Sequence, residues 1–165
     1  MLAYDEYESP QGTLILTATP KGLAGVYFKG QKHFPKRPTW QLDPHHPVLK
    51  RVKRELAEYF AGRRKRFTVA LDPQGSAFQR SVWKQIAKVG YGDTLSYGEL
   101  ARRAGHPGSA RAAGAATGRN PIGIIVPCHR IVGSDGSLTG YAGGLARKRA
   151  LLALEGARRE LRSAA

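Results

Sequence analysis

The sequence predicts an α+β protein in two parts. The first is a small α+β domain over residues 1–72, and the second is a mostly helical domain over residues 73–165 with a helix-turn-helix. Short apolar runs between Pro–Gly turn signals fill residues 2–28, which is typical of strands. From residue 47 onward, apolar residues recur at helical spacing behind helix-start signals. A chain of 165 residues can bury a core in one ordinary domain or two small ones.

The first part begins with three predicted strands that form a meander. They cover Leu2–Tyr7, Thr13–Thr17 and Leu23–Phe28. The turns between them carry Pro10–Gly12 and Pro20–Gly22. Proline presets φ and glycine tolerates positive φ, so both residues favour turns at these places.

A long loop and a helix are predicted next. Residues 29–46 contain several prolines and basic side chains. A loop of this length either carries a function or is a solvated connector, and both interpretations stay open. Pro47 begins a helix that ends at Gly62, and Arg66–Leu71 is predicted as a further strand. The helix turns one apolar stripe toward the core, formed by Val48, Val52, Leu56, Tyr59 and Phe60.

The second part opens with a linker and two helix-start signals. Asp72–Gly75 is typical of a linker. Ser76–Gln79 and Ser96–Glu99 both have the form of a capping box. The first predicted helix is interrupted at Gly90–Asp93, and the second is short, from Tyr97 to about Ala104.

A third helix completes a helix-turn-helix pattern. Gly105–Gly108 forms a turn, Ser109 is the expected N-cap, and the helix runs over Ala110–Thr117. It consists almost entirely of alanine and glycine, with Arg111 as its single long side chain. Small side chains let a nucleic-acid backbone approach, and free N–H groups at the helix start can bind phosphate. Tight packing against a neighbouring helix is the alternative.

The stretch Asn120–Arg130 holds the only cysteine of the chain. Gly123–Val126 are apolar or glycine and end at Pro127, which predicts a short buried strand ending at a rigid corner. Cys128 follows the corner and His129 is next to it. A neighbouring imidazole or cation lowers the pKa of a thiol and so favours the reactive thiolate. A lone cysteine is otherwise a buried packing residue, and adjacency alone does not decide between the two.

The end of the chain predicts a loop, a helix and a basic tail. Glycines punctuate residues 133–144, so this loop can line a pocket with Tyr141 as its aromatic side chain. Leu145 begins the last helix, and residues 157–165 are expected to fray. Three basic side chains of this helix are expected to face solvent or a partner, namely Arg147, Lys148 and Arg149.

Glu155 lies late in the last predicted helix. A carboxylate at a helix C-terminus opposes the helix dipole. Glu155 is therefore expected to have a specific partner, unless it is an exposed surface glutamate.

The formal net charge of +15 is unusual for a chain with 41% apolar and 24% charged residues. Residues 1–72 have 13 basic and 7 acidic side chains, and residues 73–165 have 14 and 5. Such a surplus indicates a polyanionic partner, either nucleic acid or an anionic membrane surface, or else a solubilising surface. The N-terminus is acidic, unlike a signal peptide, and no apolar run approaches the ~18 residues that span a bilayer.

A single cysteine cannot form an internal disulfide, which favours a reducing cytosol. It also excludes zinc sites built on two or more thiolates. The five histidines show no metal-ligand spacing beyond the pair His45–His46, which precedes Pro47 as a helix lead-in. We expect no metal, no cofactor and no membrane insertion.

Pro-Cys-His-Arg at 127–130, preceded by Asn120–Pro121, resembles the signature of the O6-alkylguanine-DNA alkyltransferases. The resemblance covers Phe78 to Gly156 through Ser96–Tyr97, Ala110–Ala112, Gly140–Tyr141 and Leu152–Gly156. Residues 1–72 match loosely, at Ser9–Gly12 and in the alternating strands. The resemblance implies a ribonuclease-H-like first domain and a second domain that binds DNA and carries the active site.

The family resemblance implies a suicide DNA repair protein, a methylated-DNA–protein-cysteine S-methyltransferase that acts once. It flips O6-alkylguanine, and O4-alkylthymine as well, out of duplex DNA and moves the alkyl group irreversibly to Cys128. In the family pattern His129 draws the thiol proton through a water, and Glu155 holds the histidine. Tyr97 helps to rotate the nucleotide and protonates the departing guanine, which leaves more easily as a neutral base. Asn120 matches the hinge between the helix-turn-helix and the active site.

The resemblance also implies binding in the DNA minor groove. Arg111 would fill the gap that the flipped base leaves in the stack. DNA-backbone contacts match Phe78, Gln79 and Ser134. The pocket wall matches Tyr141, Ala142 and Gly143. Ala142 stands where some relatives have a serine that contacts the guanine oxygen, so backbone amides would bind that oxygen here.

Two other functions stay open from the sequence. The first is a non-catalytic module that binds alkylated DNA, although relatives of that kind replace the cysteine. The second is a cysteine hydrolase that uses Cys128 and His129. We expect a cytoplasmic monomer in solution that can cluster along DNA, with residues 29–46 as a candidate contact.

Overall fold

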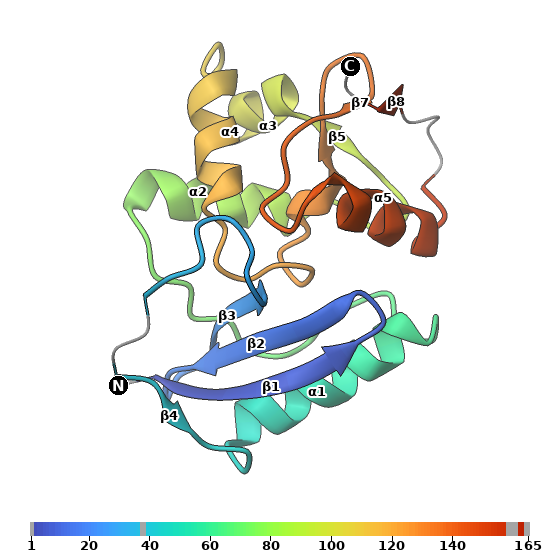
Figure 1. Cartoon of the computed structure of the whole chain (residues 1–165). Helices are drawn as coiled ribbons and strands as arrows, with labels where there is room; N and C mark the ends of the chain where they lie inside the picture. The colour runs from blue at the N-terminus through green and yellow to red at the C-terminus, as the bar shows by residue number, and fades with distance from the viewer. Residues whose placement is uncertain (1, 37–38, 158–161, 164–165) are drawn as a thin grey trace.

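The computed structural model describes residues 2–36, 39–157 and 162–163. Its lower half in Figure 1 is a sheet with one helix on its face, and its upper half is a group of helices. The prediction of an α+β protein with a helical second part is confirmed. Within the described residues, no helix is both long and apolar enough to cross a bilayer.

The sheet of the first part has the strand order β3-β2-β1-β4. The three predicted strands are confirmed as an antiparallel meander. β2 is buried from Leu14 to Ala18. α1 covers one face of the sheet, and on the other face Tyr27 of β3 packs against Phe34 and Trp40 of the loop that follows. The elements are β1 (Ala3–Ser9), β2 (Gly12–Ala18), β3 (Leu23–Phe28), β4 (Gln41–Leu42) and α1 (Pro47–Phe60).

Two predictions for this part are wrong. β4, which pairs parallel to β1, interrupts the predicted loop 29–46. The predicted strand Arg66–Leu71 makes only a single bridge, from Leu71 to Leu23. The N–H groups of Thr68 and Val69 donate instead to the buried carboxylate of Glu55, at 2.9 Å and 3.3 Å. These donors are therefore not available for a strand partner.

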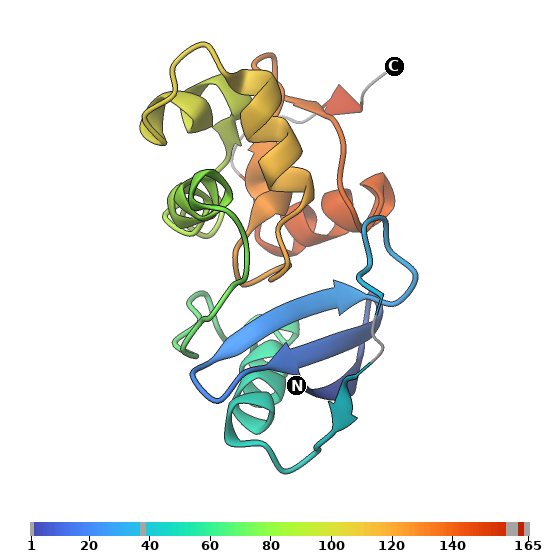
Figure 2. The ribbon, with the colours of Figure 1, turned by 90° about the vertical axis from the view of Figure 1, so that its left-hand side faces the viewer.

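The second part consists of helices and two short parallel strand pairs. The pair β7–β8 lies at the outer edge, near the C-terminal end of the chain (Figures 1 and 2). The N-cap of α2 is the full capping box predicted at Ser76 and Gln79. At α3, Ser96 accepts from the N–H of Glu99, whose carboxylate turns to arginines of the same helix. The elements are α2 (Ala77–Ile86), β5 (Leu95–Ser96), α3 (Tyr97–Arg103), α4 (Ala110–Gly118), η1 (Cys128–Arg130), β6 (Ile131–Val132), β7 (Ser137–Leu138), α5 (Leu145–Leu154) and β8 (Arg162–Ser163).

Three further expectations need correction. Ser109 makes no side-chain cap at α4. Lys148 does not face solvent, because its side chain is completely buried. In the tail that was expected to fray, Arg162–Ser163 pairs with β7 as β8, and residues 158–161 and 164–165 lie outside the described residues.

The segment before the cysteine is buried, as predicted, but it is a tight turn and not a strand. Ile124 adopts a φ of 69°, in the left-handed region that an extended strand cannot contain. The side chain of Asn120 ties the turn together, since its amide donates to Val126 O at 2.8 Å and accepts from Ile122 N at 3.0 Å. These bonds satisfy backbone groups that a sheet would otherwise satisfy.

Both parts share one hydrophobic core. Its buried members come from the sheet, from α1 and from the second part, where Ile122, Ile124 and Leu151 contribute. Val26 in β3 also forms a single bridge with Ile122. The first part is therefore packed directly behind the turn that leads to Cys128.

Candidate active site

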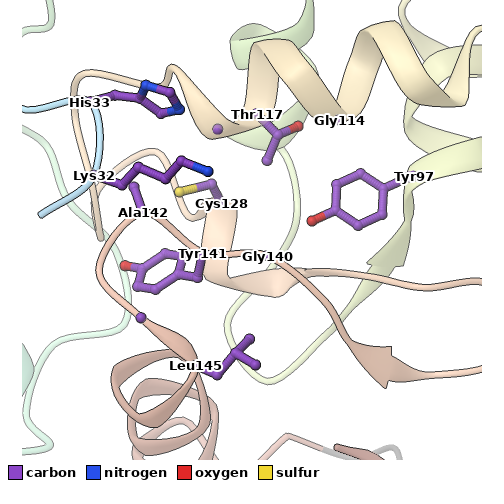
Figure 3. Close-up of a pocket in the computed structure, with 12 residues that line it drawn as sticks. Lys32, His33, Tyr97, Gly114, Thr117, Cys128, Gly140, Tyr141, Ala142 and Leu145 are labelled. Atoms are coloured by element: carbon purple, nitrogen blue, oxygen red, sulfur yellow. The ribbon is translucent and has the colours of Figure 1, made fainter. Parts of the chain in front are cut away.

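Cys128 begins a one-turn 3₁₀-helix that extends to Arg130. The turn that ends at Pro127 brings the sulfur to the wall of a cavity of about 350 Å³. Figure 3 shows the sulfur of Cys128 at this cavity, with the hydroxyl of Tyr97 pointing inward from the opposite side. The residue is only 7% exposed, so the thiol is reached through the cavity and not from open solvent.

Five segments of the chain form the cavity wall, namely the loop after β3, α3, α4, the start of η1, and the glycine-rich loop with the first residue of α5. The glycine-rich loop and α5 supply one side, and α3 and α4 supply the other (Figure 3). Tight packing, one of the two interpretations of the small residues of α4, is confirmed for Ala113 and Ala116, which lie in the core, while Gly114 lines the cavity. The main lining side chains, with Cys128, are Lys32, His33, Tyr97, Thr117, Tyr141, Ala142 and Leu145.

Lys32 and His33 are site residues that the sequence did not single out. They come from the loop after β3, and the backbone N–H of Lys32 donates to Ala142 O at 3.0 Å. This bond joins the first part of the chain to the cavity loop. His33 also has a φ of 61°, which shows that the loop is sharply bent where it meets the cavity.

Glu155 is buried and binds the two residues that follow Cys128. It is the residue after α5 and is 5% exposed. Its carboxylate accepts from His129 Nε2 at 2.7 Å and from Arg130 Nε at 2.8 Å. The partner predicted for this awkwardly placed carboxylate is therefore present.

Ionisation of this cluster follows from its hydrogen bonds. Burial raises the pKa of Glu155, but the hydrogen bonds from His129 and Arg130 lower it by more than burial raises it. The resulting pKa is about 2. An ionised carboxylate can only accept, so His129 Nε2 carries the proton. Burial also lowers the pKa of His129, which keeps the ring neutral. His129 Nδ1 then has a free lone pair, and it has no hydrogen-bond partner among the described residues.

Cys128 differs from the sequence expectation in its resting charge. Burial raises the pKa of the Cys128 thiol above its ordinary value, and this exceeds the lowering by the Asn120 side chain and by Lys148. The sulfur is therefore a neutral thiol at rest. Its proton must be removed as it reacts, which is the task of a nearby neutral base.

Lys148, which was expected to face solvent or a partner, is instead buried at the site. Its ammonium donates to the backbone oxygens of Ile131 at 2.6 Å and Thr139 at 2.8 Å, and so holds the cavity loop to η1 and β6. Burial lowers the pKa of Lys148 to about 8, against the opposing effect of Cys128. Its position relative to Leu151 and Leu152, at i−3 and i−4, could have indicated that it shares their buried face.

Some of the other predicted site residues lie at the cavity, and the rest lie away from it. Tyr97, Tyr141 and Ala142 line the cavity, while Gly143 packs against Phe28 beside it. Arg111 and Ser134 are exposed outside the cavity. Phe78 packs on His106 with ring centroids 4.9 Å apart, and Gln79 is engaged in the α2 cap. The described residues contain no cluster of three or more potential metal ligands.

Comparison with known families covers nearly the whole chain. Residues 2–73 match the ribonuclease-like domain of 6-O-methylguanine DNA methyltransferase, and residues 77–157 match its DNA binding domain. The chain belongs to the 6-O-methylguanine DNA methyltransferase family. The ribonuclease-like fold that the resemblance implied for the first part is confirmed.

Individual members of the family are similar over their full length. A methylated-DNA–protein-cysteine methyltransferase of Mycobacterium tuberculosis is 46% identical over 96% of this chain and 94% of its own. One from Methanosarcina acetivorans is 46% identical over 93% of this chain and 97% of its own. The crystal structure of Mycobacterium tuberculosis OGT in complex with DNA has a TM-score of 0.87 at 46% identity and covers 94% of both chains.

Proposed function

We propose that Cys128 is the alkyl acceptor of this protein and that His129 and Glu155 activate it. The protein is a DNA repair enzyme with methylated-DNA–protein-cysteine methyltransferase activity, as its family membership establishes. The observation that carries the residue assignment is the position of the sulfur on the cavity wall, with the Glu155-bound imidazole as the next residue. We further propose the division into residues 1–72 and residues 73–165, the second carrying the acceptor.

The geometry supports a single displacement at the alkyl carbon. The thiol proton passes through a water to His129 Nδ1, and Glu155 stabilises the resulting imidazolium. The sulfur then forms a bond to the alkyl carbon while the bond from that carbon to guanine O6 breaks. The S–alkyl bond is stable, so each molecule reacts once.

Tyr97 is placed to supply a proton to the departing guanine. Its hydroxyl lines the cavity and donates to Thr139 O at 3.3 Å, a long bond that a better acceptor can replace. Burial raises the pKa of Tyr97, so the hydroxyl keeps its proton at neutral pH. The electron pair of the broken bond goes to the purine, which leaves as a neutral base once it is protonated.

DNA is the partner, and the cavity position supports a flipped base as the substrate. The flipped base is O6-alkylguanine, and O4-alkylthymine in addition. Arg111 lies in the first turn of α4, exposed, on the helix that also supplies Gly114 and Thr117 to the cavity. An arginine there can enter the stack from the minor groove while the base occupies the cavity. Phe78, Gln79 and Ser134 are proposed as DNA-backbone contacts.

The direct test is methyl uptake by the wild-type protein. Incubation with a duplex that contains O6-methylguanine should add one methyl group per molecule, located by peptide mass spectrometry on Cys128. Binding without any gain in mass would favour a non-catalytic lesion-binding module. Repeated turnover without self-modification would favour a cysteine hydrolase.

Arg111→Ala should slow repair of duplex DNA by roughly tenfold or more, because base flipping costs a few kcal/mol and the gap would stay unfilled. Reaction with free O6-benzylguanine should keep the wild-type rate, since no stack is opened. Arg119→Ala removes the same charge from an exposed position at the other end of α4 and controls for general electrostatics. Equal losses on duplex and free base would refute the intercalating role.

Assembly and location remain proposals as well. We propose a monomer in solution that can cluster along DNA, with the basic loop 29–46 as a contact. Lys32 and His33 of this loop already lie at the cavity, so a neighbour that touches the loop could influence access to it. The lone cysteine supports a cytoplasmic location.

A further inference from the structure

The carboxylate of Glu155 has one partner from the first part of the chain. Tyr59, near the end of α1, is fully buried, and its hydroxyl donates a 2.5 Å hydrogen bond to Glu155 Oε2. The same oxygen accepts from His129 Nε2 at 2.7 Å and from Arg130 Nη2 at 3.0 Å. Tyr59 was predicted from sequence only as part of an apolar stripe. A tyrosine in such a stripe nevertheless needs a partner for its hydroxyl.

We propose that Tyr59 is a positioning residue for alkyl transfer, which fixes the Glu155 carboxylate and thereby the direction and basicity of His129. The proposal rests on the proposed role of His129 as the base. It makes the first part of the chain a component of the active site, in addition to a packing partner.

The tyrosine ring is held so that its hydroxyl has one direction. Its neighbours are Phe60, Phe67 and Tyr91, with ring centroids 5.2, 5.5 and 6.3 Å from that of Tyr59. Burial and the adjacent Glu155 raise the pKa of Tyr59, so the hydroxyl stays protonated and acts only as a donor here. A rigid donor on an ionised carboxylate limits rotation of that carboxylate, and with it the tilt of the bound imidazole.

The same bond affects the basicity of His129. Groups that face the imidazole are Glu155 at the end of α5, Lys148 within α5 and Arg130 on η1, and Tyr59 reaches it through Glu155. Glu155 stabilises the imidazolium, whereas Arg130 and Lys148 oppose it. Tyr59 draws part of the negative charge of Oε2 toward itself. Without that hydroxyl, more charge acts on His129, so the pKa of the imidazole should rise.

The test is Tyr59→Phe, which keeps the ring and removes the hydroxyl. The variant should still take up one methyl group per molecule at completion. Its single-turnover rate constant on saturating duplex should fall about tenfold near neutral pH, since a hydrogen bond to a charged group is lost. The acid limb of the rate–pH profile should move to higher pH, because the base protonates earlier as the pH falls.

Tyr91→Phe is the matched control. Its hydroxyl donates to Leu154 O at 3.3 Å, at the same end of α5, and within the described residues it makes no hydrogen bond to Glu155. This variant should keep the wild-type rate constant and acid limb. Two results for Tyr59→Phe would overturn the proposal and make Tyr59 a packing residue. One is a wild-type rate constant with a wild-type acid limb. The other is a lower final methyl uptake per molecule with the acid limb at its wild-type pH. Absence of methyl uptake by the wild type would instead refute the proposed function.

Discussion

Cys128→Ala should abolish methyl uptake completely and leave binding to a duplex with O6-methylguanine within about threefold of wild type. No other thiol exists in the chain, so no second thiolate can replace it. Alanine removes one sulfur from a site that opens on the cavity, which limits the packing change. Intact-protein mass spectrometry and a binding titration on the same duplex measure the two effects.

The outcome separates the acceptor from the binding machinery. A variant that binds the lesion and stays unmodified holds the flipped base without reacting. Any residual methyl gain in Cys128→Ala would place the acceptor on an oxygen or nitrogen nucleophile, and the assignment of Cys128 would then be wrong.

Glu155→Gln should have the second largest effect. The amide cannot stabilise an imidazolium as a carboxylate does, and its N–H₂ can turn His129 into the wrong tautomer, so transfer should slow by about a hundredfold or more. Arg130 would also lose its buried counter-charge, which should lower the free energy of unfolding by roughly 3 kcal/mol. Single-turnover kinetics and urea denaturation measure the two consequences.

The pH dependence of this stability loss gives an independent check. The pKa of Glu155 is about 2 in the folded protein, below the ordinary value near 4.3. The stabilisation by the ionised carboxylate is therefore present above the unfolded pKa and is lost as the pH falls through the folded pKa. Wild type and Glu155→Gln should converge in stability between roughly pH 4 and pH 2. A constant difference over this range would contradict the assignment.

Glu58→Gln is the matched control for Glu155→Gln. Glu58 pairs with Arg64 at 3.1 Å on the surface of α1, with 37% of its side chain exposed. Exposed ion pairs contribute about 0–1 kcal/mol, so this variant should lose little stability and keep the wild-type transfer rate. A large effect there would mean that the assays respond to charge in general.

Local sequence signals were reliable where the interactions they describe are local. Short apolar runs between turn residues predicted the meander of β1, β2 and β3, and Ser76 with Gln79 predicted the cap of α2. The turn before Cys128 was mistaken for a strand. Apolar residues there indicate burial, but the bonds from the Asn120 side chain decide the backbone path. The strand predicted at Arg66–Leu71 is absent for the same kind of reason. Thr68 N and Val69 N donate to Glu55, which lies on α1.

By itself, the sequence determined the family, the α+β division, the cysteine–histidine pair and the basic character that suits DNA. These depend on residue identity and on short-range order along the chain, which a sequence contains directly. Only the tertiary structure decided that Tyr59 meets Glu155, that Lys148 is buried under the cavity loop, and that Lys32 and His33 reach the cavity. Each of these contacts joins segments that are distant in sequence or selects which side of an element is buried, and packing of the shared core is what fixes both.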